Sequence, residues 1–196
     1  MQSIGKRMDK KSGSIIVEAT VFFLIISLMI FIFYITALGQ ARTQREMVSD
    51  DLVSSELAAF KDIDMEKLGE SDDLTLIVVT DPEASFETFK HHLKYNLNID
   101  DDFKPRSEFH FIKSKVNLDD FYIYNVYGED VEFLKLNSSG EFDKTTITNG
   151  KGTLKTPNDK IIEATTIYAK ISFEVESIFN NKVMVSTSEE VDIAKN

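Results

Sequence analysis

A run of 23 residues without a charged side chain, from Ala19 to Ala41, constrains this chain more than any other feature. The run is dense in Phe, Ile and Leu, and a helix of that length, at about 1.5 Å per residue, covers the ~30 Å hydrocarbon core of a bilayer. The alternative is a buried core helix, but such helices seldom run so far without a polar face. The sequence therefore predicts a membrane span.

Basic residues are distributed unequally around this run. Only Arg42 and Arg45 follow it before Lys61, whereas four basic residues precede it: Lys6, Arg7, Lys10 and Lys11. Because basic residues favour the cytoplasmic side, we expect a single-pass protein of the cell membrane with its N-terminus inside and its C-terminal part outside. The first 13 residues carry a net charge of +3 and the remainder −14. So acidic a domain is a poor candidate for binding nucleic acid or anionic lipid.

The chain contains no cysteine, which excludes disulfides, a thiol nucleophile and a thiolate metal site. The exported part must therefore be stabilised by its own hydrophobic core, for which ~120 residues are sufficient.

A secretory signal peptide is one alternative for the N-terminus. It has a basic start and an apolar region of about 7–15 residues before a cleavage site of small residues. The basic start is present, but the apolar region is too long. Ala37-Leu38-Gly39 weakly resembles a cleavage site, and cleavage there would start the mature chain at Gln40.

A different processing signal lies on the other side of the apolar run. Gly13 follows the basic segment, and Glu18 is the fifth residue when Ser14 is counted as the first. A basic leader, a glycine and an apolar helix with glutamate at position five resemble the class III signal of type IV pilins and pseudopilins. The segment "GSIIVEAT" looks most similar to the corresponding segment of TadE-like pseudopilins of tight-adherence (Tad/Flp) systems. The resemblance covers about Lys10 to Phe60.

This resemblance implies that a prepilin peptidase cuts after Gly13 on the cytoplasmic face, leaving Ser14 as the mature N-terminus and the span attached. There are departures from the family pattern. Ser14 stands where major pilins usually have Phe or Met, and the span contains no proline. Both departures favour a minor, TadE-like member over a major pilin.

Glu18 calls for a physical reason, because a carboxylate at the centre of a span costs roughly 2.5–3.5 kcal/mol on insertion scales, somewhat less near an end. If cleavage frees the amine of Ser14, the ammonium of one subunit can pair with Glu18 of a neighbouring subunit. Glu18 is then an assembly residue, and the partners are other pilin subunits and the pilus assembly machinery. The alternative is a plain single-pass anchor with an extracytoplasmic binding or sensing domain, in which Glu18 lies at the interface by chance.

The chain divides into four predicted parts: a leader over 1–13, a span and extended helix over 14–60, a linker over 61–73 and an α+β domain over 74–196. The extended helix would be ~70 Å long. Its outer part places Ala41, Val48, Leu52 and Ala59 near a helical repeat, with charged residues that include Glu56 between them. We expect this stripe to pack on the domain's own sheet or on a neighbouring helix.

The domain is predicted as a mainly antiparallel sheet with one short helix. Residues 74–80 read as a buried strand, and 83–97 read as an amphipathic helix with Phe86, Phe89, Leu93 and Leu97 on one face. Further strands are expected over 108–116 with Phe109, Phe111 or Ile112 inward, and over 121–128 and 131–142 with a turn at 138–140. The best hairpin joins 165–178 to 182–193 through Asn180-Asn181.

Few residues are candidates for catalysis, metal binding or ligand recognition. His91, His92 and His110 lack motif spacing, and the calcium-like Asn98, Asp100 and Asp102 lack the required glycine and terminal glutamate. Asp119-Asp120 and Glu129-Asp130 read as exposed strand ends. Tyr122, Tyr124 and Tyr127 read as cross-strand packing, with a recognition surface as the alternative. We expect no enzyme, metal or cofactor, and a structural subunit of a pilus or secretion filament.

Overall fold

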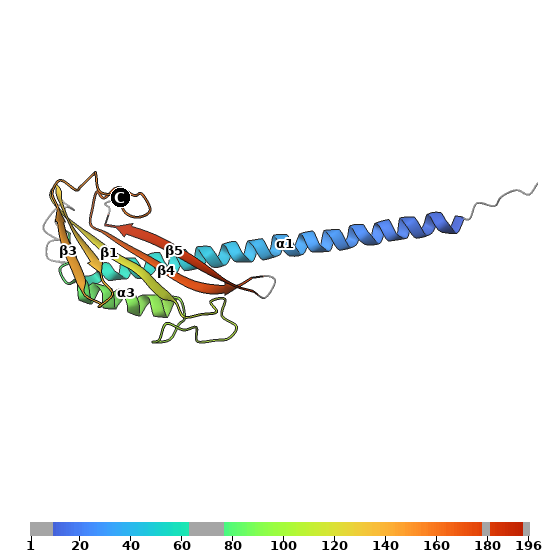
Figure 1. Ribbon diagram of the computed structural model, residues 1–196, viewed down its shortest axis with the longest axis horizontal. Helices are drawn as coiled ribbons and strands as arrows, with labels where there is room; N and C mark the ends of the chain where they lie inside the picture. The colour runs from blue at the N-terminus through green and yellow to red at the C-terminus, as the bar shows by residue number, and fades with distance from the viewer. Residues whose placement is uncertain (1–9, 63–76, 178–180, 194–196) are drawn as a thin grey trace, which may run out of the picture. The chain divides into compact units, whose positions relative to one another are not determined.

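The computed structural model describes residues 10–62, 77–177 and 181–193 of the chain (Figure 1). The chain forms two compact units, residues 1–43 and residues 44–196. The boundary falls within helix α1 (Lys10–Ala59), so each unit contains part of this helix. Unit 1 contains the apolar part of α1. Unit 2 contains the last 16 residues of α1 together with the remaining elements.

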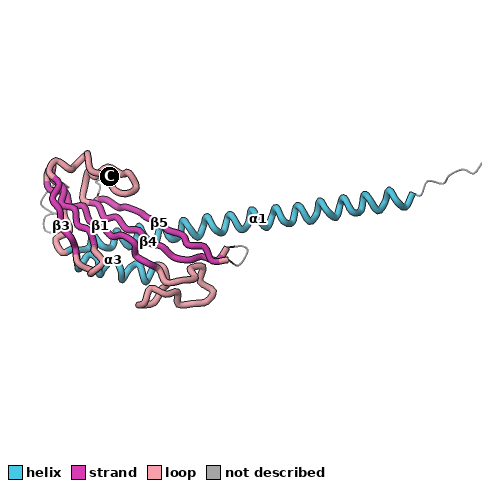
Figure 2. The backbone as a smooth tube through the Cα atoms, in the orientation of Figure 1, coloured by secondary structure: helices cyan, strands magenta, loops and turns pink. Residues whose placement is uncertain are grey.

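Unit 2 is built on a five-stranded sheet of order β3-β2-β1-β4-β5, in which all neighbours are antiparallel (Figure 2). The strands are β1 (Asn117–Tyr127), β2 (Asp130–Leu136), β3 (Phe142–Ile147), β4 (Thr166–Glu176) and β5 (Lys182–Asp192). The longest pairing joins β4 to β5, from Thr166 opposite Asp192 to Glu176 opposite Lys182. The predicted hairpin pairing is thus confirmed, although most of its turn lies outside the described residues.

The sequence of helix α3 (Pro82–Asn96) explains where the helix begins and which face is buried. Asp81 is its N-cap, and the Asp81 carboxylate accepts a hydrogen bond of 2.9 Å from the Ala84 N–H. Pro82 occupies the first turn, where its missing N–H costs nothing. Phe86, Phe89 and Leu93 then recur on one face and are buried, as their spacing predicts.

Helix α3 lies antiparallel to the part of α1 that belongs to unit 2. The Ser85 hydroxyl, near the start of α3, donates 3.0 Å to the carbonyl of Ala59 at the end of α1. At the other end of α3, the Asn96 amide donates 3.3 Å to the carbonyl of Asp51. A short 3₁₀ helix, η1 (Phe60–Asp62), follows α1.

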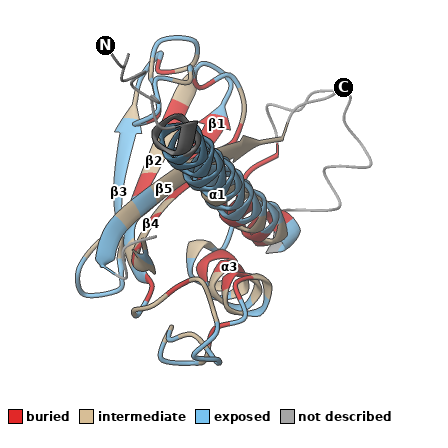
Figure 3. Cartoon of the chain, turned by 90° about the vertical axis from the view of Figure 1, so that its right-hand side faces the viewer, coloured by how far each residue is buried: buried red, intermediate tan, exposed pale blue. Residues whose placement is uncertain are grey.

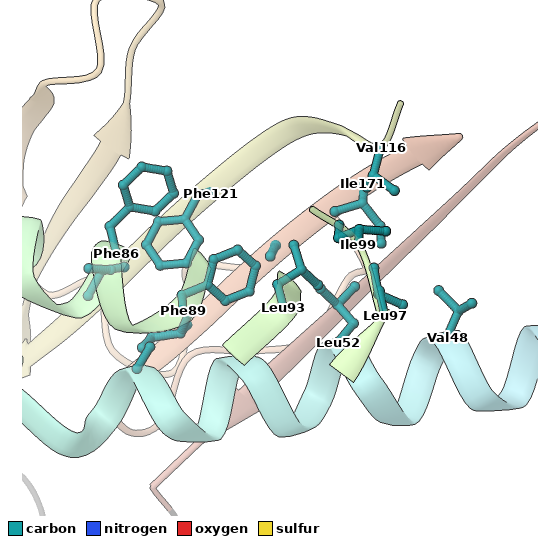
Figure 4. Close-up of a cluster of buried hydrophobic side chains, with 14 of the residues drawn as sticks. Val48, Leu52, Phe86, Phe89, Leu93, Leu97, Ile99, Val116, Phe121 and Ile171 are labelled. Carbon is teal, nitrogen blue, oxygen red and sulfur yellow. The ribbon is translucent and has the colours of Figure 1, made fainter. Parts of the chain in front are cut away.

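Both helices pack on one face of the sheet and form the main core (Figures 3 and 4). Val48, Leu52 and Ala59 of α1 are buried there, which confirms these three positions of the predicted stripe and their packing on the domain's own sheet. Ala41, the first predicted position, is exposed. On β4 the inward positions alternate as predicted and include Ile167, Ala169, Ile171 and Phe173. The described residues therefore confirm an α+β fold with an antiparallel sheet and one short helix.

The opposite face of the sheet carries a smaller cluster. Tyr124 and Tyr168 are buried, and Tyr122 and Phe133 pack beside them. The rings of Tyr124 and Phe133 stack with centroids 5.0 Å apart, and those of Tyr122 and Tyr168 stack at 5.3 Å. This is the cross-strand packing expected of Tyr122 and Tyr124, whereas Tyr127 lies outside the cluster and is exposed.

The strand predicted over 74–80 is wrong where the structure describes it, from Ile77 onwards. Ile77 to Val79 are buried, but the only β-structure among these described residues is an isolated bridge at Val79. The amide of Asn125 takes the place of a strand partner, because Val79 N–H donates 2.8 Å to Asn125 Oδ1 and Asn125 Nδ2 donates 3.0 Å to the Val79 carbonyl. The Thr165 hydroxyl similarly donates to the Ile77 carbonyl. Side chains hold this segment where a β-ladder was expected.

The strand predicted over 108–116 is also wrong. Only Ile112 makes an isolated bridge, to Val175 of β4, and Ile112 is fully buried. Phe109 points to solvent instead of inward. A turn closed by the His110 N–H on the Ser107 carbonyl replaces the extended backbone.

Candidate membrane-insertion and assembly segment

Among the described residues, one helix is long and apolar enough to cross a membrane, and it begins near the N-terminus. Its large apolar side chains from Ile15 to Leu38 are 38–73% exposed, and none of them is buried. An exposed apolar surface of this length marks a site for lipid or for another protein. This segment is therefore the main candidate site of unit 1.

Two hydroxyl side chains within the apolar run are satisfied by the helix itself. Thr20 Oγ1 donates 2.8 Å to the Ile16 carbonyl, and Thr36 Oγ1 donates 2.9 Å to the Ile32 carbonyl. Such bonds to the preceding turn are the usual way in which threonine is accommodated in an apolar helix. These two threonines therefore add little cost to burial in hydrocarbon.

The residues predicted for processing lie at the start of α1. Gly13 and Ser14 have helical backbone, as do Lys10 and Lys11, whereas Lys6 and Arg7 lie outside the described residues. Glu18 is four residues after Ser14, and residues four apart share one face of a helix. The helix therefore brings positions 14 and 18 onto one face.

Gly39 belongs to the alternative cleavage site and also lies within α1. A β-carbon built at Gly39 meets nothing within 4 Å. A larger side chain is therefore sterically acceptable at this position.

The predicted weak candidates for chemistry are not brought together in unit 2. Among the residues that the structure describes, no three His, Asp or Glu side chains gather as a metal site. The Asp100 carboxylate instead caps a turn by accepting from the N–H groups of Asp102 and Lys104. Asp101 forms an ion pair with Lys94 at 2.8 Å.

His110 and the acid pair Asp119-Asp120 also have local partners. His110 Nδ1 accepts from the Ile112 N–H, and partial burial lowers the pKa of His110. Asp120 accepts 2.5 Å from the Tyr122 hydroxyl, and Asp119 accepts from Ser172. Burial is the main cause that raises the pKa of Tyr122, and the hydrogen bond to Asp120 raises it further. These contacts are structural, and they join neighbouring strands or order a loop.

Glu56 is a residue whose role the sequence analysis missed, because it was placed only among the charged residues between the apolar positions of α1. Its side chain is 0% exposed, and Oε1 accepts 2.8 Å from the Ala169 N–H on β4. Oε2 has no hydrogen-bond partner among the described residues. Burial, reinforced by Glu189 and Glu190, raises the pKa of Glu56 to about 9 against the opposing effects of the Ala169 bond and Lys160. The spacing could have indicated that Glu56 is buried, because Glu56 lies four residues after Leu52 and three before Ala59 and so shares the buried face of the helix.

The chain matches no protein-family model, no curated protein and no solved structure at a significant level. What is established is therefore the class of architecture, a long apolar N-terminal helix followed by an antiparallel α+β unit.

Proposed function

We propose that this chain is a minor, pseudopilin-like subunit of a pilus or secretion filament, inserted in the cell membrane through residues 14–41 and assembled through the same helix. The observation that carries the proposal is the exposed apolar face of α1 combined with an acid, Glu18, one helical turn after Ser14. The basic leader and Gly13 stand immediately before that face. A prepilin peptidase, other pilin subunits and the assembly machinery are the proposed partners.

The architecture of unit 2 supports a structural role over an enzymatic one. The part of α1 beyond the apolar run is fixed to the sheet by core packing and by the Glu56 bond to Ala169. Asp100, Asp120, His110, Tyr122 and Tyr124 make local contacts in turns or in side-chain packing.

Two glycine substitutions in the same helix test processing. We expect Gly13→Leu to abolish cleavage in cells that contain the peptidase, because the enzyme requires a small residue before the scissile bond. Gly39→Leu is the matched control, since the space at Gly39 is open and the substitution would block only cleavage of a secretory type. Mass spectrometry of the wild-type chain should find Ser14 at the N-terminus. A chain that begins at Gln40 supports secretion, and an intact chain supports the plain anchor.

Glu18→Ala tests assembly separately from insertion. Insertion should persist or improve, because an acid no longer enters lipid, and cleavage should persist because the scissile bond lies four residues upstream. Assembly should fail, since a neighbour's ammonium would be left buried and unpaired at a cost on the order of 3–5 kcal/mol. Asp50→Ala removes an exposed acid from the same helix beyond the apolar run and should assemble normally. Crosslinking to partner subunits gives the answer, and Glu18→Ala that crosslinks like wild type would remove Glu18 from the proposal.

A further inference from the structure

Exposed apolar side chains gather at one end of unit 2. Phe109 is 96% exposed on the loop between α3 and β1, and Tyr95 in the last turn of α3 is 80% exposed. Val183 and Met184, at the start of β5, are 47% and 58% exposed. A single exposed apolar residue needs no explanation, but Phe109 is almost fully exposed, and Tyr95, Val183 and Met184 add exposed apolar surface at the same end of the unit. We refer to these four residues as the Phe109 end.

Backbone contacts place the Phe109 loop beside the β4–β5 hairpin. Ile112 bridges to Val175, and the Lys113 N–H donates 2.7 Å to the Glu174 carbonyl. Val175 and Glu174 in turn lie opposite Val183 and Met184. The loop and the start of β5 therefore belong to the same end of the sheet.

This is also the end at which the chain enters unit 2. Because α1 and α3 are antiparallel, the chain traced back from Ala59 to Gln44 passes the C-terminal end of α3. Val48 lies beside Leu97 and Ile99, the residues with which the loop begins (Figure 4). Only Arg42 and Thr43 separate unit 2 from the uncharged run. Along the chain, this end of unit 2 therefore directly follows the uncharged run.

Phe109 is held outward by an ordered turn. The Phe109 N–H donates 3.2 Å to the Ser107 hydroxyl, and the His110 N–H donates 3.1 Å to the Ser107 carbonyl. Lys113 Nζ donates to the Glu108 carbonyl and lies 3.5 Å from Glu176 at the end of β4. A ring presented by a fixed turn loses little conformational entropy when it is covered.

The local charge differs from that of the chain as a whole. Residues 103–116 contain four basic side chains and one acidic, whereas the whole chain has a net charge of −11. When the preceding acids Asp100, Asp101 and Asp102 are included, the loop carries four basic and four acidic side chains and is balanced. The Phe109 loop therefore lacks the excess of acid that would repel phosphate headgroups from the rest of unit 2.

We propose that the Phe109 end rests on the lipid surface beside the span, with the Phe109 ring inserted among the headgroups. Aromatic side chains are enriched at this depth of a bilayer because an apolar ring gains contact there without entering the hydrocarbon centre. The proposal rests on the membrane-spanning part of the proposed function, and it is independent of cleavage after Gly13 and of pairing by Glu18. Its consequence is that unit 2 has a preferred orientation on the membrane before any assembly.

Single-tryptophan probes test this contact, because the chain contains no tryptophan. Full-length Phe109→Trp is reconstituted into vesicles of phosphatidylcholine with a minor fraction of phosphatidylglycerol, with and without brominated acyl chains. We expect bromination to lower the emission of Phe109→Trp, because an aromatic side chain at the interface lies within reach of the acyl chains. Tyr127→Trp, at the opposite end of β1, is the matched control and should show no loss.

Phe31→Trp, within the apolar run, separates the two ways in which the test can fail. Strong quenching of Phe31→Trp without quenching of Phe109→Trp overturns the surface contact and leaves the span intact. No quenching of Phe31→Trp overturns the membrane span and the contact together. If Phe109→Trp is unquenched but its emission shifts to the blue as the protein-to-lipid ratio rises, a second copy covers this end, and the lipid proposal is wrong.

Discussion

Replacing Glu56 by glutamine should change how the stability of unit 2 depends on pH. The pKa of Glu56 is raised from 4.5 to about 9, so the folded unit holds a proton that the unfolded chain releases above pH 4.5. Stability is therefore greatest below the unfolded value and falls as pH rises towards the folded value. At pH 7, which is 2.5 pH units above the unfolded pKa, the loss of stability is roughly 3.5 kcal/mol at about 1.4 kcal/mol per unit.

Glutamine keeps the oxygen that accepts from the Ala169 N–H and has no proton to lose. Glu56→Gln should therefore resemble wild type near pH 5 and exceed its stability increasingly above that pH. Urea unfolding of the full chain in mild detergent measures this, with near-ultraviolet circular dichroism of the packed tyrosines as the probe. That signal reports on unit 2, because Tyr122, Tyr124 and Tyr168 lie in one cluster.

The comparison needs a second acid as a reference. Glu129→Gln changes an exposed glutamate in the turn between β1 and β2 and reports the general effect of removing one negative charge. The reasoning is refuted if the difference between wild type and Glu56→Gln is independent of pH, or if wild type gains stability between about pH 5 and 8 relative to the variant.

Two further substitutions test how sequence fixes the fold of unit 2. Asn125→Ala should lower the free energy of unfolding by about 2–4 kcal/mol, because it leaves the buried N–H and carbonyl of Val79 without partners; a loss under about 1 kcal/mol in urea titration would contradict this. Asp81→Ala should cost about 1 kcal/mol by removing the cap of α3, whereas Asp81→Asn should cost much less; equal losses for both would show that the cap bond is unimportant.

Much of this architecture could be predicted from local sequence. Helix α3 has an N-cap, a proline in its first turn and a periodic apolar face. In β4, apolar residues occupy every second position from Ile167 to Val175. In both elements the local sequence signals agree with one another. Membrane insertion is predicted by the same kind of pattern, since a long run without charge has few alternatives. Cleavage after Gly13 and the role of Glu18 stay predictions, because they depend on other proteins.

The segments that were predicted wrongly are those whose partners are distant side chains. Residues 77–79 have the composition of a strand, but the amide of Asn125 and the hydroxyl of Thr165 supply their hydrogen bonds. In residues 108–116 the alternation of apolar residues is interrupted by a turn around Ser107 that exposes Phe109. Local pattern identifies apolar residues, whereas the partner available after folding decides which of them are buried.

Glu18 and Glu56 of α1 are both acids beside apolar residues, but the same cost of burying a carboxylate predicts different effects of a glutamine substitution at the two positions. A carboxylate away from water must gain a cation or keep a proton. Glu56 faces one N–H donor and two nearby acids, so it keeps a proton, and glutamine is an adequate replacement. The proposal for Glu18 supplies a neighbour's ammonium, for which glutamine offers a hydrogen bond without charge. Glu18→Gln should therefore assemble less well than wild type but better than Glu18→Ala, while Glu56→Gln assembles normally. If Glu18→Gln assembles as well as wild type, the neighbour's ammonium is not the partner of Glu18.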